Sequence, residues 1–323
     1  MALQRLIVHL PMLELLPGGV TRLPRPMRRL IEGARRVECS EREALAGLLE
    51  IPSLPAPAVL SSLARPGAIE QKAGWWLRFD PVRLIPDLTA VWLDRAMPLD
   101  FGSSALHPVV AELQEMFCAE GFEWHPEPGE RFGLLKLEDE PACAFFAPDE
   151  VHGKRLDDVL PEGPDAARWR RLINESQMVF HQFRSLSRSD QQGQGLWFWG
   201  AGAMKASPTP SRALCMVDSA GSARVQGLAS WLGARLDDSA TCFDDVDDSF
   251  CHVHWPLQSV DLEASLARLS EYWLTPARRA QRRGRLPEIF IIGSTGYWRS
   301  GRLAPMKFWR RRAEGFETGE GEA

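Results

Sequence analysis

The sequence predicts an α/β protein built on a mixed sheet with flanking helices. Short apolar runs typical of buried strands alternate along the chain with segments whose apolar residues recur at helical spacing. The composition is that of a globular chain, with 45% hydrophobic and 25% charged residues, which excludes disorder throughout its 323 residues. This length is enough for one large domain or two ordinary ones.

The N-terminal half opens on a strand and continues into a capped helix. The capping-box pattern of Ser40 and Glu43 predicts the start of that helix, and Gly121 predicts the end of a later one. In chain order, the predicted elements are a buried strand at 3–10, the helix from Ser40, a loop with at most a short helix at 51–68, two strands within 74–93 around a turn at Pro81 or Pro86, a helix at 108–120, and a hairpin with strands at 122–125 and 131–137.

The C-terminal half contains the clearest helix, at 165–183, where apolar residues follow one face from Trp169 to Phe183. The other predicted elements are strands at 196–199, 214–217, 250–255 and 289–292, a helix near 225–236, and a helix from Asp261 that Pro276 interrupts. An acidic stretch with several prolines precedes this half. We therefore predict an N-terminal α/β region at 1–160 and a C-terminal α/β region at 161–323, as two domains or as one continuous domain.

Charge and cysteine usage exclude several classes of protein. A net charge of -5 gives no reason to expect a nucleic-acid partner. No apolar stretch approaches the roughly 18 residues of a membrane span. His9 and Pro11 interrupt the apolar run at 6–8, so we expect no signal peptide. The six cysteines form no Cys-x-x-Cys pair and mostly adjoin apolar residues, which predicts reduced, buried thiols and a cytoplasmic location.

Arginine supplies nearly all of the positive charge, because only five of the 38 basic residues are lysines. Arg binds phosphates and carboxylates through two parallel hydrogen bonds, although a biased genome composition produces the same ratio. The Arg-rich stretches at 278–285 and 310–312 could bind phosphates or an acidic protein partner. The alternative is a solvated helix face.

The strand at 196–199 is followed by Gly200-Ala201-Gly202, in the place where loops that bind phosphate commonly lie. The segment lacks the third glycine of a dinucleotide-binding motif and the Gly-Lys-Ser/Thr of a P-loop, although Lys205 lies nearby. It is either a tight turn or a ligand-facing turn. The sequence contains no Gly-x-Ser-x-Gly nucleophile elbow.

The segment 242–254 concentrates aspartate, cysteine and histidine, which are all ligand types for transition metals. In a strand, His252 and His254 share one face and Cys251 lies on the other. The aspartates form consecutive pairs, which is typical of a solvated loop. We therefore expect no metal or other cofactor. The weak candidate ligands are Asp244, Asp248, His252 and His254.

A polar stripe follows the helix at 165–183, with side chains at i, i+3 and i+7. Two tryptophans, two residues apart on the next strand, could form the floor of a pocket. The predicted ligand-binding residues are Asn174, Gln177, His181, Trp197, Trp199, Gly200 and Gly202. The alternatives are a stripe that faces solvent or is hydrogen-bonded internally, and tryptophans that pack in the core.

Two segments resemble a small bacterial family, namely 168–181 (RWRRLINESQMVFH) and 196–202 (LWFWGAG). The resemblance extends in patches to 76–84 (WLRFDPVRL) and 289–309. Members of the family are identified as cofactor-independent phosphoglycerate mutase-like proteins or as RpfE-type regulatory proteins linked to pathogenicity. The resemblance implies a scaffold like that of the alkaline-phosphatase superfamily, whose enzymes use two metal ions and a Ser or Thr nucleophile.

The sequence departs from the pattern of the active mutases. Such enzymes usually open with an Asp-Gly motif near the first strand, whereas this chain has no Asp-Gly dipeptide and its first strand ends near His9 without an acidic residue. Gln194-Gly195 stands where Asn commonly precedes Leu-Trp-x-Trp-Gly. We therefore expect a degenerate scaffold that has lost the chemistry.

Three functions follow from these observations. The one we favour is a non-catalytic, cytoplasmic regulatory or ligand-binding protein of a bacterium, rich in tryptophan and similar to phosphoglycerate mutase. The second is an active metal-dependent phosphoglycerate mutase or phosphatase. The third is a module that binds a protein partner through its Arg clusters. We expect an unknown small ligand or protein partner, no membrane and no nucleic acid.

Overall fold

The structure, a computed structural model, describes residues 3–11, 13–16, 22–65, 74–97, 99–124, 126, 131–183, 194–204, 206–208, 214–257 and 261–301. They form two compact units. Unit 1 comprises the described residues of Met1–Leu54 and Ser207–Ala323, and unit 2 those of Pro55–Ala206. Among the helices that the structure describes, none is both long and apolar enough to cross a membrane.

Unit 1 is built on a seven-stranded mixed sheet. Its strands are, in spatial order, β2 (Arg35–Glu38), β12 (Gly296–Gly301), β11 (Glu288–Ile292), β1 (Arg5–His9), β10 (Phe250–His254), β8 (Leu214–Asp218) and β9 (Arg235–Leu236). The strands from β11 to β9 are parallel, whereas β12 and β2 are antiparallel. The central strands are buried along nearly their whole length, which explains why they read as continuous apolar runs.

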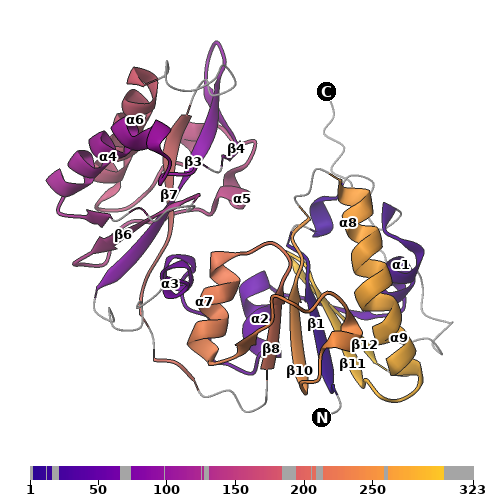
Figure 1. Cartoon of the computed structure of the whole chain (residues 1–323). Helices are drawn as coiled ribbons and strands as arrows, with labels where there is room; N and C mark the ends of the chain where they lie inside the picture. Colours follow the sequence, from indigo (N-terminus) through magenta and orange to yellow (C-terminus); the bar gives the residue numbers. More distant parts are fainter. Residues whose placement is uncertain are drawn as a thin grey trace. The chain divides into compact units, whose positions relative to one another are not determined.

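Helices cover both faces of this sheet (Figure 1). One face carries α2 (Glu41–Leu48) and α7 (Ala223–Leu232), and the other carries α1 (Arg25–Glu32), α8 (Leu262–Arg268) and α9 (Thr275–Arg282). Two 3-10 helices, η1 (Leu13–Leu15) and η7 (Phe243–Asp245), lie in the connections. Because side chains alternate along a strand, Leu6 and Val8 join the core with α1, α8 and α9, whereas His9 points toward α2.

A π-helical stretch, η8 (Leu269–Leu274), joins α8 to α9 without a break. Pro276, in the first turn of α9, lacks a backbone N–H, and its ring crowds the carbonyl group of Tyr272 four residues earlier. The wider π-helical turn directly before α9 relieves both problems. The predicted interruption at Pro276 is therefore a change of helix type and not an end of the helix.

Unit 2 is built on a five-stranded antiparallel sheet. Its strands are β4 (Val91–Ala96), β3 (Trp75–Pro86), β6 (Gly133–Leu137), β5 (Glu123–Trp124) and β7 (Gln194–Ala203). Its helices are α3 (Pro57–Leu63), η4 (Ser104–Leu106), α4 (His107–Ala119), α5 (Pro148–Val151), η5 (Leu156–Asp158) and α6 (Ala166–Gln182). β3 is long enough to pair with β6 and β4 in succession along one side and with β7 along the other.

Aromatic rings fill the core of unit 2 between the sheet and its helices. The ring centroid of Phe79 on β3 lies 5.3 Å from that of Phe117 on α4, 5.2 Å from that of Trp124 and 5.9 Å from that of Phe198. The same ring covers Gly133 of β6, where an added Cβ would lie 1.8 Å from Cζ of Phe79. Only glycine leaves room for the ring at that position.

The predicted boundary near residue 160 lies inside unit 2. β6 precedes that position and β7 follows it, yet both pair with β3 in one sheet. Unit 2 is therefore a continuous segment inserted between α2 and β8 of unit 1. An acidic, proline-containing stretch marks a loop, but it carries no information about which strands pair across it.

Candidate functional site

Three parallel strands of unit 1 end side by side in polar residues. His9 ends β1, His254 ends β10 and Asp218 ends β8, and the register pairs His9 with His254 and His254 with Asp218. Ligands of open α/β sheets commonly bind at the carboxyl ends of the strands, where the strand order reverses. This carboxyl edge of unit 1 is therefore the candidate site.

Four side chains meet at the carboxyl edge, and we call them the edge cluster: His9, Glu41, His252 and His254. The ring centroid of His9 lies 4.9 Å from that of His254 and 5.8 Å from that of His252. Nδ1 of His9 is 3.2 Å from Nδ1 of His254, and Nε2 of His9 is 3.3 Å from Oε1 of Glu41. The three histidines are buried, whereas the Glu41 side chain is 30% exposed. The cluster therefore runs from the interior to the surface.

The contacts of His9 assign roles to its two ring nitrogens. Nε2 has no well-aligned hydrogen bond within the described residues, but the nearby carboxylate of Glu41 favours a proton on this atom. Nδ1 of His9 is then the acceptor, and Nδ1 of His254 donates to it. A carboxylate that holds an imidazole in one tautomer is a common arrangement in both catalytic and binding sites.

His252 is the most deeply buried member of the edge cluster, at 1% exposure, and neither of its ring nitrogens has a hydrogen-bond partner among the described residues. Burial, followed by the charge of His9, lowers the pKa of His252 to about 3, against the opposing effect of Glu41. An unpaired buried polar group costs about 1–3 kcal/mol. Packing therefore does not explain this histidine, and such groups are markers of functional sites.

Charged groups surround the edge cluster. Burial by itself raises the pKa of Glu41, but the contact with His9 and then the charges of Arg224 and Arg42 bring it below the ordinary value. Burial and then the charge of His9 place the pKa of His254 well below its ordinary value. At neutral pH, His254 is therefore uncharged, and two guanidinium groups act on the single carboxylate of Glu41.

The other acidic residues at this edge are held by backbone donors. Asp218 accepts hydrogen bonds from two backbone N–H groups in the turn before α7. Glu14 accepts from the backbone N–H groups of Ser294 and Thr295, at 2.8 and 3.0 Å, just after β11. In the part of the chain that the structure describes, no group of three or more His, Cys, Asp or Glu is arranged to hold a metal ion. These residues do not fit the two-metal centre that the resemblance implies.

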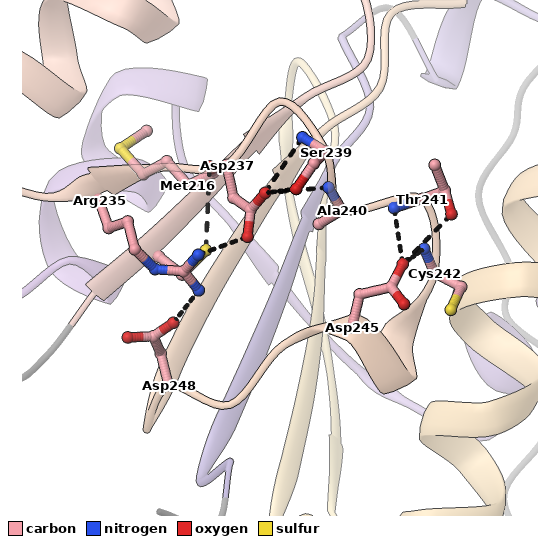
Figure 2. Close-up of polar contacts among 10 residues, drawn as sticks. Met216, Arg235, Asp237, Ser239, Ala240, Thr241, Cys242, Asp245 and Asp248 are labelled. Atoms are coloured by element: carbon pink, nitrogen blue, oxygen red, sulfur yellow. Dashed lines mark hydrogen bonds and ion pairs between the residues drawn. The ribbon is translucent and has the colours of Figure 1, made fainter.

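The structure does not bring the four weak metal-ligand candidates together. His252 and His254 share one face of β10, as predicted. Asp248 precedes β10 at the opposite end from His254 and pairs with Arg235 (Figure 2). Asp244 is exposed on η7. Because a strand rises about 3.3 Å per residue, the length of β10 separates the aspartates from the edge cluster.

The Asp-rich segment is a surface loop whose aspartates hold its own backbone (Figure 2). Asp245 accepts from the backbone N–H groups of Thr241 and Cys242 at 2.8 and 2.9 Å, and these hydrogen bonds lower its pKa. Asp237 accepts in the same way from the N–H groups of Ser239 and Ala240, at 3.1 and 3.0 Å. These contacts order the loop without any ligand.

The predicted turn at Gly200-Ala201-Gly202 is wrong, because β7 continues through these residues. The register between β3 and β7 shifts at this point, which makes a β-bulge with Gly200 at a φ of 70°. An added Cβ at Gly202 would lie 2.4 Å from Cβ of Ala56, the residue that precedes α3. The glycines thus allow α3 to approach the strand closely.

The polar stripe of α6 lies away from these glycines. Asn174 and His181 are exposed, and Gln177 packs against Gly195 at the start of β7, where an added Cβ would lie 2.8 Å from its Cγ. The chain from Gly195 to Gly200 is extended, so the two places are roughly 16 Å apart. The structure therefore does not gather the predicted ligand-binding residues into one site.

Trp197 and Trp199 are 1% and 6% exposed, and the indole N–H of each is bonded within unit 2. Nε1 of Trp197 donates to the carbonyl oxygen of Phe146 at 2.8 Å. Nε1 of Trp199 donates to the carboxylate of Asp80, which also accepts from Arg78 at 2.7 and 2.8 Å. Both tryptophans therefore pack in the fold, which was the alternative to a pocket floor.

The Arg-rich helix divides into one structural arginine and several solvated ones. Arg278 donates to Oγ of Ser300 at 3.0 Å and to Oε1 of Gln281 at 3.2 Å, which ties α9 to β12. The exposed members are Arg279, Arg282, Arg283 and Arg285. Lys205 and the three arginines at 310–312 lie outside the described residues.

All six cysteines are free thiols, but the expected burial holds only for Cys215 and Cys251. Cys118 is exposed because it follows Phe117, whose side chain occupies the core-facing side of α4. An apolar neighbour in sequence therefore does not predict burial on a helix, where adjacent residues point about 100° apart.

Sequence reasoning missed His9 and Glu41, two of the four residues in the edge cluster. A signal was present, because a histidine ends an otherwise apolar buried strand. The sequence of one strand does not reveal which strand pairs with it, and His9 and His254 are 245 positions apart in the chain. The pairing of β1 with β10 brings them together.

Comparison with known proteins finds a distant sequence relative. No protein-family profile matches the chain. A stretch of 98 residues, 29% of this chain, is 24% identical to a probable 2,3-bisphosphoglycerate-independent phosphoglycerate mutase of Geobacter sulfurreducens. The match spans only 25% of that relative's length.

Two solved structures resemble the fold over most of its length. One is a cofactor-independent phosphoglycerate mutase from Thermoplasma acidophilum, with a TM-score of 0.43, 13% identity and coverage of 93% of this chain and 90% of that one. The other is the PH0037 protein from Pyrococcus horikoshii, with a TM-score of 0.44, 12% identity and coverage of 93% and 88%. In sequence, this chain has a distant and partial phosphoglycerate mutase-like relationship.

Proposed function

We propose that this chain is a ligand-binding protein whose edge cluster, together with Arg224, binds a small phosphorylated anion. The observation that carries the proposal is the burial of three imidazoles beside one carboxylate at the carboxyl ends of β1 and β10. Apolar residues of similar volume would fill the same space without the cost of desolvating polar groups. Hydrogen bonds to a bound ligand would offset the cost of burying these polar side chains.

The charges at the carboxyl edge favour an anion. Arg224 and Arg42 both act on the carboxylate of Glu41, the one acidic side chain of the edge cluster, and thus place two positive charges beside it. α2 and α7 both begin at this edge and direct the positive ends of their dipoles toward it. Neutral imidazoles can also donate hydrogen bonds to phosphoryl oxygens. Since the sequence relative is named as a phosphoglycerate mutase, a phosphoglycerate is the first ligand to test.

The same proposal holds that the protein does not interconvert phosphoglycerates. Asp218 and Glu14, two carboxylates at this edge, are engaged by backbone N–H groups. The role is then a regulatory or ligand-binding one in the cytoplasm, on a degenerate alkaline-phosphatase-like scaffold. Similarity to RpfE-type regulatory proteins and binding of a protein partner through the Arg clusters stay predictions.

A metal-dependent phosphoglycerate mutase or phosphatase is the second candidate. One observation favours it: Oγ of Ser219 donates to the carbonyl oxygen of His254 at 3.1 Å, which places a hydroxyl beside the edge cluster. A hydroxyl at the edge of such a site is a candidate nucleophile if a base takes its proton.

Calorimetric titration tests the binding proposal. We expect saturable binding of 3-phosphoglycerate and no binding of glycerate, which lacks the phosphoryl group. Arg224→Gln and His9→Asn should each weaken binding about tenfold or more, which corresponds to about 1.4 kcal/mol. Arg268→Gln, which removes the same charge from an exposed position on α8, is the matched control and should bind as the unaltered protein does.

Equal binding by all variants would contradict the edge cluster as the site, and the absence of saturable binding would contradict the proposal itself. Phosphorus NMR of 3-phosphoglycerate, incubated with the protein and added Mn²⁺ or Mg²⁺, separates the two candidates. Formation of 2-phosphoglycerate or free phosphate, abolished in Ser219→Ala, would establish the enzyme.

A further inference from the structure

Two buried cysteines lie side by side on neighbouring parallel strands of unit 1. Cys215 is the second residue of β8 and Cys251 the second residue of β10, and the two are direct partners in the register. Neither side chain is exposed, and both belong to the same core cluster. Neighbouring strands are about 4.8 Å apart. That spacing lies within the range of roughly 4.4–6.8 Å that separates the Cα atoms of disulfide-bonded cysteines.

The two thiols lie close enough to influence each other's ionisation. A hydrogen bond from Cys251 lowers the pKa of Cys215, and the same bond, followed by burial, raises the pKa of Cys251. Arg235, the register partner of Cys215 on β9, adds a positive charge that favours the Cys215 thiolate. Figure 2 shows Arg235 held between Asp237 and Asp248, which fixes the guanidinium at this end of the strands. Cys215 is therefore the better nucleophile of the pair.

We propose that Cys215 and Cys251 form a reversible disulfide that links β8 to β10. With hydrogen peroxide as the oxidant, the Cys215 thiolate attacks one oxygen, which breaks the O–O bond and leaves a sulfenic acid and hydroxide. The Cys251 sulfur then attacks the sulfenic sulfur and displaces its oxygen as water once a proton is taken up. Overall, two thiols lose two electrons and two protons, and one peroxide becomes two water molecules.

The surrounding fold makes the bond slow to form. Both thiols are buried, so the oxidant reaches them only when the sheet edge opens. β9, the edge strand that pairs with β8 at Cys215, is only two residues long, and local opening of this edge gives access to the thiol.

Peptide mapping of the full-length protein tests the proposal. Native protein is treated with hydrogen peroxide, its remaining thiols are alkylated, and its peptides are analysed by mass spectrometry without reduction. We expect a cross-linked pair of peptides containing Cys215 and Cys251, two hydrogen atoms lighter than their sum, and its loss on treatment with dithiothreitol. Recovery of both cysteines only as alkylated thiols or separate oxyacids would overturn the proposal.

A variant that keeps only the pair provides an independent measurement. Cys39→Ser, Cys118→Ser, Cys143→Ser and Cys242→Ser together change partly or fully exposed positions and leave both core thiols in place. Peroxide should remove the two remaining thiols in parallel and without dimer formation. The further change Cys251→Ser should leave Cys215 unable to form an intramolecular bond. Loss of one thiol without the other in the pair variant would contradict the disulfide.

Discussion

The burial of His252 makes the stability of the folded protein depend on pH. Its ring is buried in unit 1, and its uncharged form is strongly favoured because burial lowers its pKa to about 3. The histidine has an ordinary pKa of about 6.5 in the unfolded chain. The folded state therefore binds fewer protons than the unfolded state between these two values.

The expected result is a loss of stability in acid. The contribution of His252 is fully present above pH of about 6.5 and falls by up to about 1.4 kcal/mol per pH unit as the pH decreases toward 3. His252→Leu should flatten this dependence and, at neutral pH, equal or exceed the original stability, because it removes an unpaired buried polar group. Urea unfolding from pH 4 to 8 measures both effects. The control is His152→Leu at an exposed position; an unchanged slope in His252→Leu would contradict the assignment.

Gly133 is a second position where one residue decides the packing. The ring of Phe79 occupies the place of its missing side chain, and an alanine Cβ would lie 1.8 Å from Cζ. Gly133→Ala should destabilise the protein by about 1–3 kcal/mol, because the ring must leave a packed aromatic cluster. Chemical denaturation measures the loss. Gly47→Ala, where nothing lies within 4 Å of the added Cβ, should be neutral or stabilising. Similar stabilities for the two variants would contradict this packing.

At the scale of elements, α6 is stabilised mainly by the apolar side chains on its buried face. Trp169, Leu172, Ile173 and Phe180 are buried on that face, whereas Asn174 lies on the exposed side. Phe180→Ala should cost about 3–5 kcal/mol through lost burial and a residual cavity. Asn174→Ala should change stability by less than about 0.5 kcal/mol. Thermal and urea unfolding measure both, and comparable losses would mean that the polar side of the helix is buried.

At the scale of the whole molecule, the inserted unit 2 has a sheet and an aromatic core of its own. We expect residues 55–206, expressed alone, to fold cooperatively, with near-UV circular dichroism from the packed tryptophans. The same fragment with Gly133→Ala provides a negative control for that packing. A fragment that binds hydrophobic dyes and unfolds without cooperativity would show that unit 2 depends on unit 1.

Local patterns in the sequence predicted many elements correctly. The capping box of Ser40 and Glu43 and the glycine after α4 predicted helix ends, because caps and positive-φ glycines satisfy groups within a few residues. The apolar runs predicted β1, β8, β10 and β11, and together with the helical segments they predicted the α/β class with a mixed sheet. β2 and β12 were missed, because their sequences carry arginines and glycines on an antiparallel edge.

The tertiary structure alone decided which distant residues meet. Parallel pairing placed His9 beside His254 and Cys215 beside Cys251. The pairing of β7 with β3 placed residue 160, the predicted boundary, inside unit 2. The same pairing of β7 with β3 places Gly200 in a β-bulge, where the sequence predicted a turn. The physical reason is that caps and side-chain periodicity act over a few residues, whereas strand order depends on burying apolar faces across the whole chain. The sequence by itself determined the helix caps and the buried central strands, and the pairing of the strands determined the edge cluster.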